Sequence, residues 1–273
     1  MRENLLGEFL RARRELVRPE EHGLPDLGRR RVPGLRREEV AMLAGISAEY
    51  YVRLERGRDR NPSPQVLNAL ARVLGLDEES RAYAASLVTA EPAGRRGPDS
   101  EAPPPGVLRL LHATPELPAF VINRYMDVLV ANRAAEVLHG GSFSGNLVRH
   151  LFLYPAARDY YPDWEEAALE AVATLRGSAA GHLDDPRLAA LVGELSVKSP
   201  EFGRMWARHD VKAKTSGTKR IVSPIVGPLT ISWEGLAITS APGQLLVTYS
   251  AEPGSPSAAA LAAVADLAQR NPA

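Results

Sequence analysis

The 273-residue sequence contains no cysteine, only four lysines and no long apolar run. Without cysteine the chain cannot form disulfides, thiolate metal sites or a cysteine nucleophile. No apolar stretch approaches the roughly 18 residues of a membrane span, and the first 17 residues are amphipathic rather than a signal peptide. We therefore expect a cytoplasmic protein that does not enter membranes. The six histidines are scattered without paired spacing, so no metal site or cofactor is expected.

The chain also has no formal net charge, because its 33 Lys and Arg residues balance its 33 Asp and Glu residues. Residues 1–90 hold 16 Arg against 14 acidic residues, so non-specific affinity for nucleic acid should be modest. Phosphate binding would then depend on where individual arginines lie. We expect a homodimer, since two half-sites supply the specific affinity that one weakly charged domain lacks.

Residues 36–57, RREEVAMLAGISAEYYVRLERG, have the pattern of two short helices joined by a tight turn. Small residues on its first helix let a second helix approach, and Gly45 supplies the backbone freedom for the turn. Ser47 is placed to cap the second helix, and Gly57 lies where a helix commonly ends. The pattern predicts a helix-turn-helix whose second helix, residues 47–56, presents one face outward. On periodicity alone, the hairpin could equally belong to an ordinary all-α domain.

Arginines surround the hairpin, as contacts to DNA phosphates require. They are Arg29, Arg30, Arg31, Arg36, Arg37, Arg56, Arg58 and Arg60. We expect a double-stranded DNA operator as partner, with Arg53 reaching a guanine edge and Arg37 and Arg56 meeting phosphates. The predicted DNA-binding residues are Arg36, Arg37, Ser47, Ala48, Glu49, Tyr50, Arg53, Arg56 and Arg58.

The pieces AGIS, RLERG and PSPQVLNALARVLGL closely resemble the Xre family of bacterial helix-turn-helix regulators. The resemblance implies an all-α bundle of five helices from about Leu5 to Leu87. It makes residues 1–90 the DNA-binding domain and residues 47–56 the recognition helix in the major groove.

A segment with five Pro and three Gly, residues 91–106, follows. We expect a linker without a packed element, extended at the three consecutive prolines 103–105. Beyond it, residues 107–273 show two short strands, several helices, further strands and a last helix. The later strands are predicted at Val211–Thr215, Thr218–Ser223, Leu229–Leu236 and Gln244–Ala251. This order predicts an α+β, PAS-like domain in which helices wrap one face of a five-stranded antiparallel sheet around a small cavity.

Four longer pieces closely resemble the MmyB-like ligand-binding domain found behind Xre-type heads. They are NRYMDVLVANRAAEVL, GNLVRHLFLYPAARDYYPDWEEAALEAVATLR, EFGRMWARHDV and SPIVGPLTISWEGLAI. The resemblance covers about residues 107–268 and implies a PAS-like domain that binds a small, largely apolar, fatty-acid-like molecule. One position departs from the family, because Ser223 stands where a His usually precedes Pro-Val-Val-Gly, so the ligand could differ.

A ligand cavity needs large apolar side chains and a few polar groups that fix orientation. The predicted lining residues are Phe120, Val130, Phe152, Trp164, Trp206, His209, Ile231 and Trp233. Among them Trp164 and Trp206 rank first, since an indole ring offers apolar surface and an N–H donor. A carboxylate ligand would be held by a cation near WARHDVKAK or by Asn123, Arg124 or Asn132. Each of these residues could instead belong to an ordinary core or helix end.

Two functions stay open on the sequence alone. The leading one is a transcription regulator that binds DNA and responds to a small apolar molecule. The effector would change the packing of the C-terminal domain and so the separation of two Arg-rich heads. The alternative is a DNA-binding regulator whose PAS-like domain only dimerises or docks a partner protein. Catalysis by Ser223 with His209 and Asp210 is disfavoured, because the chain has no Gly-x-Ser-x-Gly turn and no evident oxyanion hole, and we expect no enzyme.

Overall fold

The computed structural model describes residues 4–24, 34–89, 102–141, 143–180, 182 and 185–270. The chain divides into two compact units. The first consists of Met1–Gly94 with the short segments Ala180–Leu183 and Arg204–Lys212. The second consists of Arg95–Ala179, Asp184–Gly203 and Ala213–Ala273.

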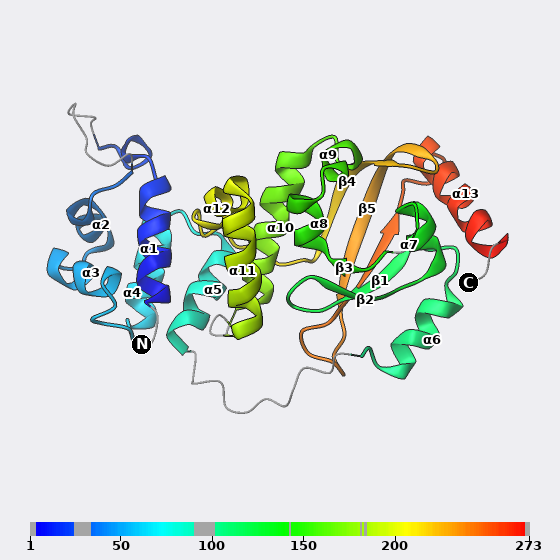
Figure 1. Cartoon of the computed structure of the whole chain (residues 1–273). Coiled ribbons are helices and arrows are strands. Elements are labelled where there is room, and N and C mark those ends of the chain that lie inside the picture. Colours follow the sequence, from blue (N-terminus) through cyan, green and yellow to red (C-terminus); the bar gives the residue numbers. More distant parts are fainter. Residues whose placement is uncertain are drawn as a thin grey trace. The chain divides into compact units, whose positions relative to one another are not determined.

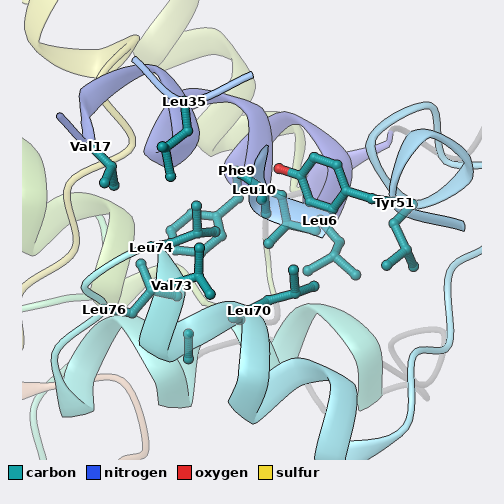
Figure 2. Packing of buried hydrophobic residues seen from close by; sticks show 14 of the residues in the cluster. Leu6, Phe9, Leu10, Val17, Leu35, Tyr51, Leu70, Val73, Leu74 and Leu76 are labelled. Carbon is teal, nitrogen blue, oxygen red and sulfur yellow. The ribbon is translucent and has the colours of Figure 1, made fainter. Parts of the chain in front are cut away.

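The first unit contains the predicted bundle of five helices (Figure 1). They are α1 (Leu5–Leu16), α2 (Arg37–Ala44), α3 (Ala48–Glu55), α4 (Pro64–Val73) and α5 (Glu78–Thr89), with a 3-10 turn η1 (Pro19–His22) after α1. Apolar side chains from all five helices form one core, and Figure 2 shows Phe9 and Leu10 of α1 packed beside Leu70 and Leu74. All four are buried. Burial of such side chains is the main source of the bundle's stability.

Local signals explain where these helices begin and end. Ser47 Oγ accepts a hydrogen bond from the Tyr50 N–H at 3.2 Å, which caps α3 as predicted. Ser63 caps α4 in the same way, with Pro64 in the first turn. Gly45 adopts a φ of 69°, the left-handed conformation that the turn between α2 and α3 needs.

The second unit is built on a six-stranded antiparallel sheet with the order β3-β2-β1-β6-β5-β4. The strands are β1 (Ala119–Ile122), β2 (Asp127–Ala131), β3 (Gly145–Asn146), β4 (Ser216–Ser223), β5 (Gly227–Ala237) and β6 (Leu245–Ser250). The helices are α6 (Pro105–Ala113), α7 (Arg133–Leu138), α8 (Leu147–Leu153), α9 (Ala156–Tyr160), α10 (Trp164–Ser178), α11 (Pro186–Lys198), α12 (Pro200–Trp206) and α13 (Pro256–Arg270). The last three residues of α12 are grouped with the first unit. Helices with an antiparallel sheet confirm the α+β prediction, but the predicted number of five strands is wrong, because the two-residue strand β3 extends the sheet to six.

The register of the strands defines one face of the sheet, here called the inner face. Lys219 pairs with Ile231 across β4 and β5, and Trp233 pairs with Tyr249 across β5 and β6. Paired residues of antiparallel strands point to the same side, as do residues two apart. Phe120 of β1 pairs with Val247, which is two residues from Tyr249. The inner face therefore carries Phe120, Lys219, Ile231, Trp233 and Tyr249.

The opposite face of the sheet has a separate apolar cluster. Val121 and Leu246 pair with each other and pack with Leu111 of α6. Because α6 supplies Leu111, the segment after the predicted linker belongs to the fold. Helix α6 begins at Pro105, and proline is tolerated there because the first N–H of a helix has no partner within the helix. The predicted linker over residues 91–106 therefore extends too far at its C-terminal end. Residues 91–101 lie outside the described residues.

The strand predicted at Val211–Thr215 is wrong, and β4 instead begins at Ser216. Ser216 and Gly217, which separate the predicted strands Val211–Thr215 and Thr218–Ser223, therefore lie within a strand. Gly217 stands opposite Trp233, and a Cβ at this position would lie 2.8 Å from the indole Nε1. The glycine thus gives the indole ring room rather than making a turn. In the described part of the chain, no helix is long and apolar enough to cross a membrane.

Candidate DNA-binding surface and ligand site

Helix α3 presents the outward face that the sequence predicts. Glu49, Arg53 and Arg56 are exposed, whereas Tyr51 and Leu54 are buried in the bundle core. The Arg53 guanidinium lies 5.4 Å from the centre of the Tyr50 ring. An arginine held beside an aromatic ring on an exposed helix face can reach a base edge in the major groove.

A buried ion cluster fixes α3 against α1 and α2. Glu55, at the end of α3, accepts hydrogen bonds from Arg14 Nε at 2.6 Å and from Arg37 Nε at 2.5 Å. The side chains of Glu55 and Arg14 are 1% and 4% exposed. Arg14 also donates to the carbonyl of Leu35 at 2.8 Å. Burial disfavours the Arg14 charge, but the hydrogen bond to Glu55 and its negative charge raise the pKa of the guanidinium overall.

This cluster changes the role of one predicted phosphate contact. Arg37 is 38% exposed, and its Nε is already engaged by Glu55. Its first role is therefore to neutralise a buried carboxylate, which sequence spacing did not indicate. All nine predicted DNA-binding residues lie on or beside the hairpin: Arg36, Arg37, Ser47, Ala48, Glu49, Tyr50, Arg53, Arg56 and Arg58. Six of them are exposed, namely Arg36, Ser47, Glu49, Arg53, Arg56 and Arg58. Arg29, Arg30 and Arg31 lie outside the described residues.

The predicted ligand-lining residues do not form one group. Trp164 packs edge-on against Phe152 with ring centres 5.5 Å apart, and Phe152 packs likewise on Phe202 at 5.3 Å. The indole N–H of Trp164 donates to the Leu151 carbonyl at 2.9 Å, and the Arg158 guanidinium lies 3.9 Å from the ring centre. With its N–H and one ring face occupied, Trp164 acts in packing rather than as a ligand donor.

Other predicted lining residues also lie elsewhere. Trp206 and His209 belong to the first compact unit, where the His209 ring lies 6.5 Å from that of Phe9. Val130 pairs with Val121 and packs with the cluster on the opposite face of the sheet. Phe120, Ile231 and Trp233 do lie on the inner face. The last of these is covered by Gly217 and by Lys214, whose Nζ lies 4.0 Å from the indole ring centre.

The predicted polar candidates in NRYMDVLVAN serve the backbone. The Asn132 amide oxygen accepts from the N–H groups of Ala119 and Ala135, and its nitrogen donates to the carbonyls of Thr114 and Leu117. Asn123 Oδ1 accepts from the N–H groups of Tyr125 and Asp127 and so closes the turn between β1 and β2. Arg124 donates to the Pro242 carbonyl at 3.3 Å. These contacts indicate structural roles.

Ser223, which stands in place of the family histidine, is also occupied. Its hydroxyl donates to the Leu138 carbonyl at 2.7 Å and accepts from the Ile225 N–H at 3.2 Å. Asp210 accepts from Arg13 at 2.6 Å and from Arg208 at 2.7 Å within the first unit. Neither side chain is arranged as the nucleophile or orienting acid of a triad would be. Among the described residues, no group of three or more His, Asp or Glu side chains is placed to hold a metal ion.

A group of aromatic and basic residues lies on the inner face, and the sequence did not single it out. We call it the inner-face cluster: His139, Tyr160, Tyr161, Lys219 and Tyr249. The His139 ring lies 5.2 Å from that of Tyr160 and 6.1 Å from that of Tyr249. Tyr160 and Tyr161 contact each other with ring centres 4.8 Å apart. The chain thus brings residues from α7, α9, β4 and β6 together.

Phenylalanines enclose one side of the inner-face cluster. The His139 ring stacks on Phe143 with centres 3.8 Å apart and planes at 4°. Phe120 in turn lies 4.9 Å from Phe143 and 5.5 Å from Tyr249. Among the predicted lining residues, Phe120 is therefore in direct contact with the cluster.

The electrostatics of the inner-face cluster are unusual for a core. Lys219 Nζ donates to the Tyr249 hydroxyl at 3.0 Å and lies 4.7 Å and 5.8 Å from the ring centres of Tyr249 and Tyr161. Burial, together with the Lys219 charge, lowers the pKa of His139 to about 3, so this imidazole is neutral at pH 7. Burial raises the pKa of Tyr160, Tyr161 and Tyr249.

Two polar atoms of the inner-face cluster are buried without a hydrogen-bond partner in the described structure, His139 Nε2 and Tyr160 OH. Buried polar atoms nearly always have partners, so each exception needs an explanation. One signal in the sequence could have revealed this cluster. Lys219 occupies an inward position of an alternating strand, between Gly217 and the buried Ile221, where an apolar residue is usual.

Comparison with known families agrees with this architecture. Residues 103–264 match the family described as MmyB-like transcription regulator ligand binding domain, and residues 5–84 match the family described as Helix-turn-helix domain. The first match covers more than half of the chain. No curated protein is significantly similar to the chain. The two matches confirm the predicted helix-turn-helix head and the predicted MmyB-like domain.

Proposed function

Since the chain belongs to the family of MmyB-like transcription regulators, we propose that it changes its binding to DNA in response to a small, largely apolar molecule of the fatty-acid-like class. The helix-turn-helix head binds an operator through the exposed face of α3. The second unit binds the effector at the inner face of its sheet. The proposal places the protein in the cytoplasm with its DNA and includes no catalytic step, metal or cofactor.

The main support for an effector site comes from two buried polar atoms that have no hydrogen-bond partner in the described structure, His139 Nε2 and Tyr160 OH. Leaving such a group unpaired costs about 1–3 kcal/mol, so a core selected only for packing would pair it or replace it. Here both atoms lie among aromatic rings on the inner face. A bound molecule with apolar surface and a polar group would satisfy them, which favours a ligand site over a filled core.

The test of the effector is to denature the purified chain and identify released small molecules by mass spectrometry. Operator affinity is then measured by fluorescence anisotropy before and after delipidation, and again after the released molecule is added back. We expect a lipid-like molecule whose removal changes operator affinity. If nothing is released and fatty acids leave DNA binding unchanged, the second unit only dimerises or docks a partner protein.

We also propose that the protein acts as a homodimer formed mainly through residues 107–273. Leu236 on the opposite face of the sheet supports this, because it is 52% exposed and pairs with Leu246 of the apolar cluster there. Exposed apolar patches commonly mark interaction surfaces. Sedimentation equilibrium of the full chain should give a dimer that Leu236→Asp weakens. If the mass distribution of that variant is unchanged, the dimer contact does not include Leu236.

A further inference from the structure

A short segment late in the chain belongs to the DNA-binding head. Residues Arg204–Lys212, here called the strap, are grouped with Met1–Gly94, whereas the residues on either side, Asp184–Gly203 and Ala213–Ala273, belong to the second unit. We infer that helix α1 of the head is a docking surface for the strap, and that docking of the strap sets the affinity of the head for DNA. This inference rests on the proposed function, because it assumes that α3 binds DNA.

Three consecutive residues of the strap contact the head. The His209 ring lies edge-on to the Phe9 ring of α1, with ring centres 6.5 Å apart. Asp210 Oδ1 accepts a hydrogen bond from Arg13 Nη1 at 2.6 Å, and Val211 packs against the hydrophobic core of the bundle. Phe9 and Arg13 are four residues apart, so they lie on one face of α1. The strap therefore holds this face through a ring contact, an ion pair and an apolar contact.

The ion pair between Arg13 and Asp210 is only partly accessible to water. Its side chains are 18% and 26% exposed, and Arg13 Nε is buried without a hydrogen-bond partner in the described structure. Removing the carboxylate would leave a largely buried charge without compensation. Arg208 differs, because it also donates to Asp210 but is 49% exposed and can be solvated by water. The contact with Arg13 is therefore the one that anchors the strap.

The backbone of the strap is strained at the point of contact. His209 has a φ of 54°, a left-handed conformation that is uncommon for any residue other than glycine. Such a conformation persists where surrounding contacts maintain it. Here the ring contact with Phe9 and the adjacent ion pair of Asp210 supply those contacts. Strain at this position opposes docking, which favours a strap that can detach over one that is permanently fixed.

The strap lies beside the residue that fixes the predicted recognition helix. Arg14 directly follows Arg13 and donates to Glu55, at the end of α3, at 2.6 Å. A strap that holds the last turns of α1 therefore also supports the anchor of α3, and we expect operator affinity to fall when the strap detaches. Strand β4 begins at Ser216, so only residues 213–215 join the strap to the sheet. A change at β4 can thus reach α1 along the chain.

The first test exchanges the charges of the anchoring ion pair in the full chain. An operator is selected from random duplexes with the wild-type chain, and its affinity is measured by fluorescence anisotropy. Arg13→Asp and Asp210→Arg should each weaken operator binding by about 5- to 20-fold, and the double variant should recover most of that loss. Asp266→Arg is the matched control, because it makes the same charge change at an exposed residue of α13, and it should change the affinity by no more than about twofold.

Hydrogen exchange without DNA measures docking of the strap directly. In Asp210→Arg the amides of α1 should exchange at least about 5-fold faster, while the amides of β1 and β6 keep their wild-type rates. His209→Asn is a milder variant, since asparagine tolerates the left-handed backbone but lacks the ring, and it should accelerate the same amides less. It replaces the charge variants if they do not fold. Wild-type exchange of α1 in a folded strap variant overturns the inference.

An insertion tests whether the strap connects the head to the second unit. Gly-Gly-Ser placed between Lys212 and Ala213 adds slack at the boundary of the two units. The strap should remain docked, so α1 exchange and operator affinity stay at their wild-type values. Any change in operator affinity that dodecanoate causes in the wild type should be lost. If dodecanoate changes the affinity equally with and without the insertion, the strap is not the connection.

The outcomes separate this inference from the proposed function. If the double charge variant binds the operator no better than the single variants, the inference is overturned while DNA binding stands. If no operator can be selected, the proposed function fails, and restored protection of α1 in the double variant alone still supports docking. If dodecanoate leaves the wild-type affinity unchanged, the proposed response to an effector fails, and the charge exchange decides the role of the strap.

Discussion

Replacing Glu55 by Gln should destabilise the DNA-binding head more than any surface substitution in it. Gln keeps the shape of the side chain but removes the charge that Arg14 and Arg37 share. Removing one partner of a buried pair typically costs about 3–5 kcal/mol, and Gln can still accept one hydrogen bond, so we expect about 3 kcal/mol. For a unit of this size, that loss lowers the melting temperature by roughly 12–24 °C.

The assay is thermal and urea unfolding of the full chain, with hydrogen exchange of α1 and α3 amides to report on the head alone. Glu8→Gln is the matched control, since Glu8 is an exposed carboxylate on α1, the same helix as Arg14, and its replacement should change the unfolding free energy by no more than about 0.5 kcal/mol. If Glu55→Gln and Glu8→Gln change the unfolding free energy equally, the buried cluster does not stabilise α3 and the reasoning fails.

Three further predictions follow from single side chains. Arg53→Ala should weaken binding to the operator by about 1–3 kcal/mol and relax the base preference at one position. Arg56→Ala should weaken binding to operator and random DNA alike. If Arg53→Ala weakens binding to both DNAs equally, Arg53 does not contact a base. Asn132→Ala should lower the unfolding free energy by about 2–3 kcal/mol, because backbone groups at both ends of its amide lose partners, and a change below the error of urea titration would contradict this. The pKa of His139 falls from 6.5 when unfolded to about 3 when folded, so stability is complete above pH 6.5 and is lost as the pH falls toward 3, by up to about 1.4 kcal/mol per pH unit. His139→Phe should therefore flatten the pH dependence of unfolding, and parallel curves for the two proteins would argue against a buried neutral imidazole.

Features encoded by local signals could be predicted from the sequence. Ser47, Gly45 and Ser63 set helix ends through contacts within a few residues, so the helices around them were predictable. Alternation along Leu229, Ile231 and Trp233 likewise revealed β5 and its buried side. The break predicted before Thr218 is wrong, because in a sequence a glycine that makes room for an indole ring resembles a glycine that makes a turn.

Side-chain roles that depend on distant partners could not be predicted. Arg37 is a basic residue in the hairpin, as a phosphate contact would be, and only the fold brings the Glu55 carboxylate to it. The sequence shows that Trp164 has an indole N–H donor, but only the fold shows that the Leu151 carbonyl accepts from it. The inner-face cluster combines residues up to 110 positions apart on four elements, so no spacing rule could assemble it.

The outermost strands of the sheet limit how two copies of the chain could join. An outer strand has unpaired N–H and C=O groups and can recruit another strand. Strand β3 is two residues long, which offers little for pairing. On the other side β4 carries the adjacent cations Lys219 and Arg220, the latter held by Asp163 at 2.6 Å. Charges of this kind oppose the addition of a foreign strand, so two copies should meet through faces of their sheets, and cross-β aggregation should be suppressed at these edges.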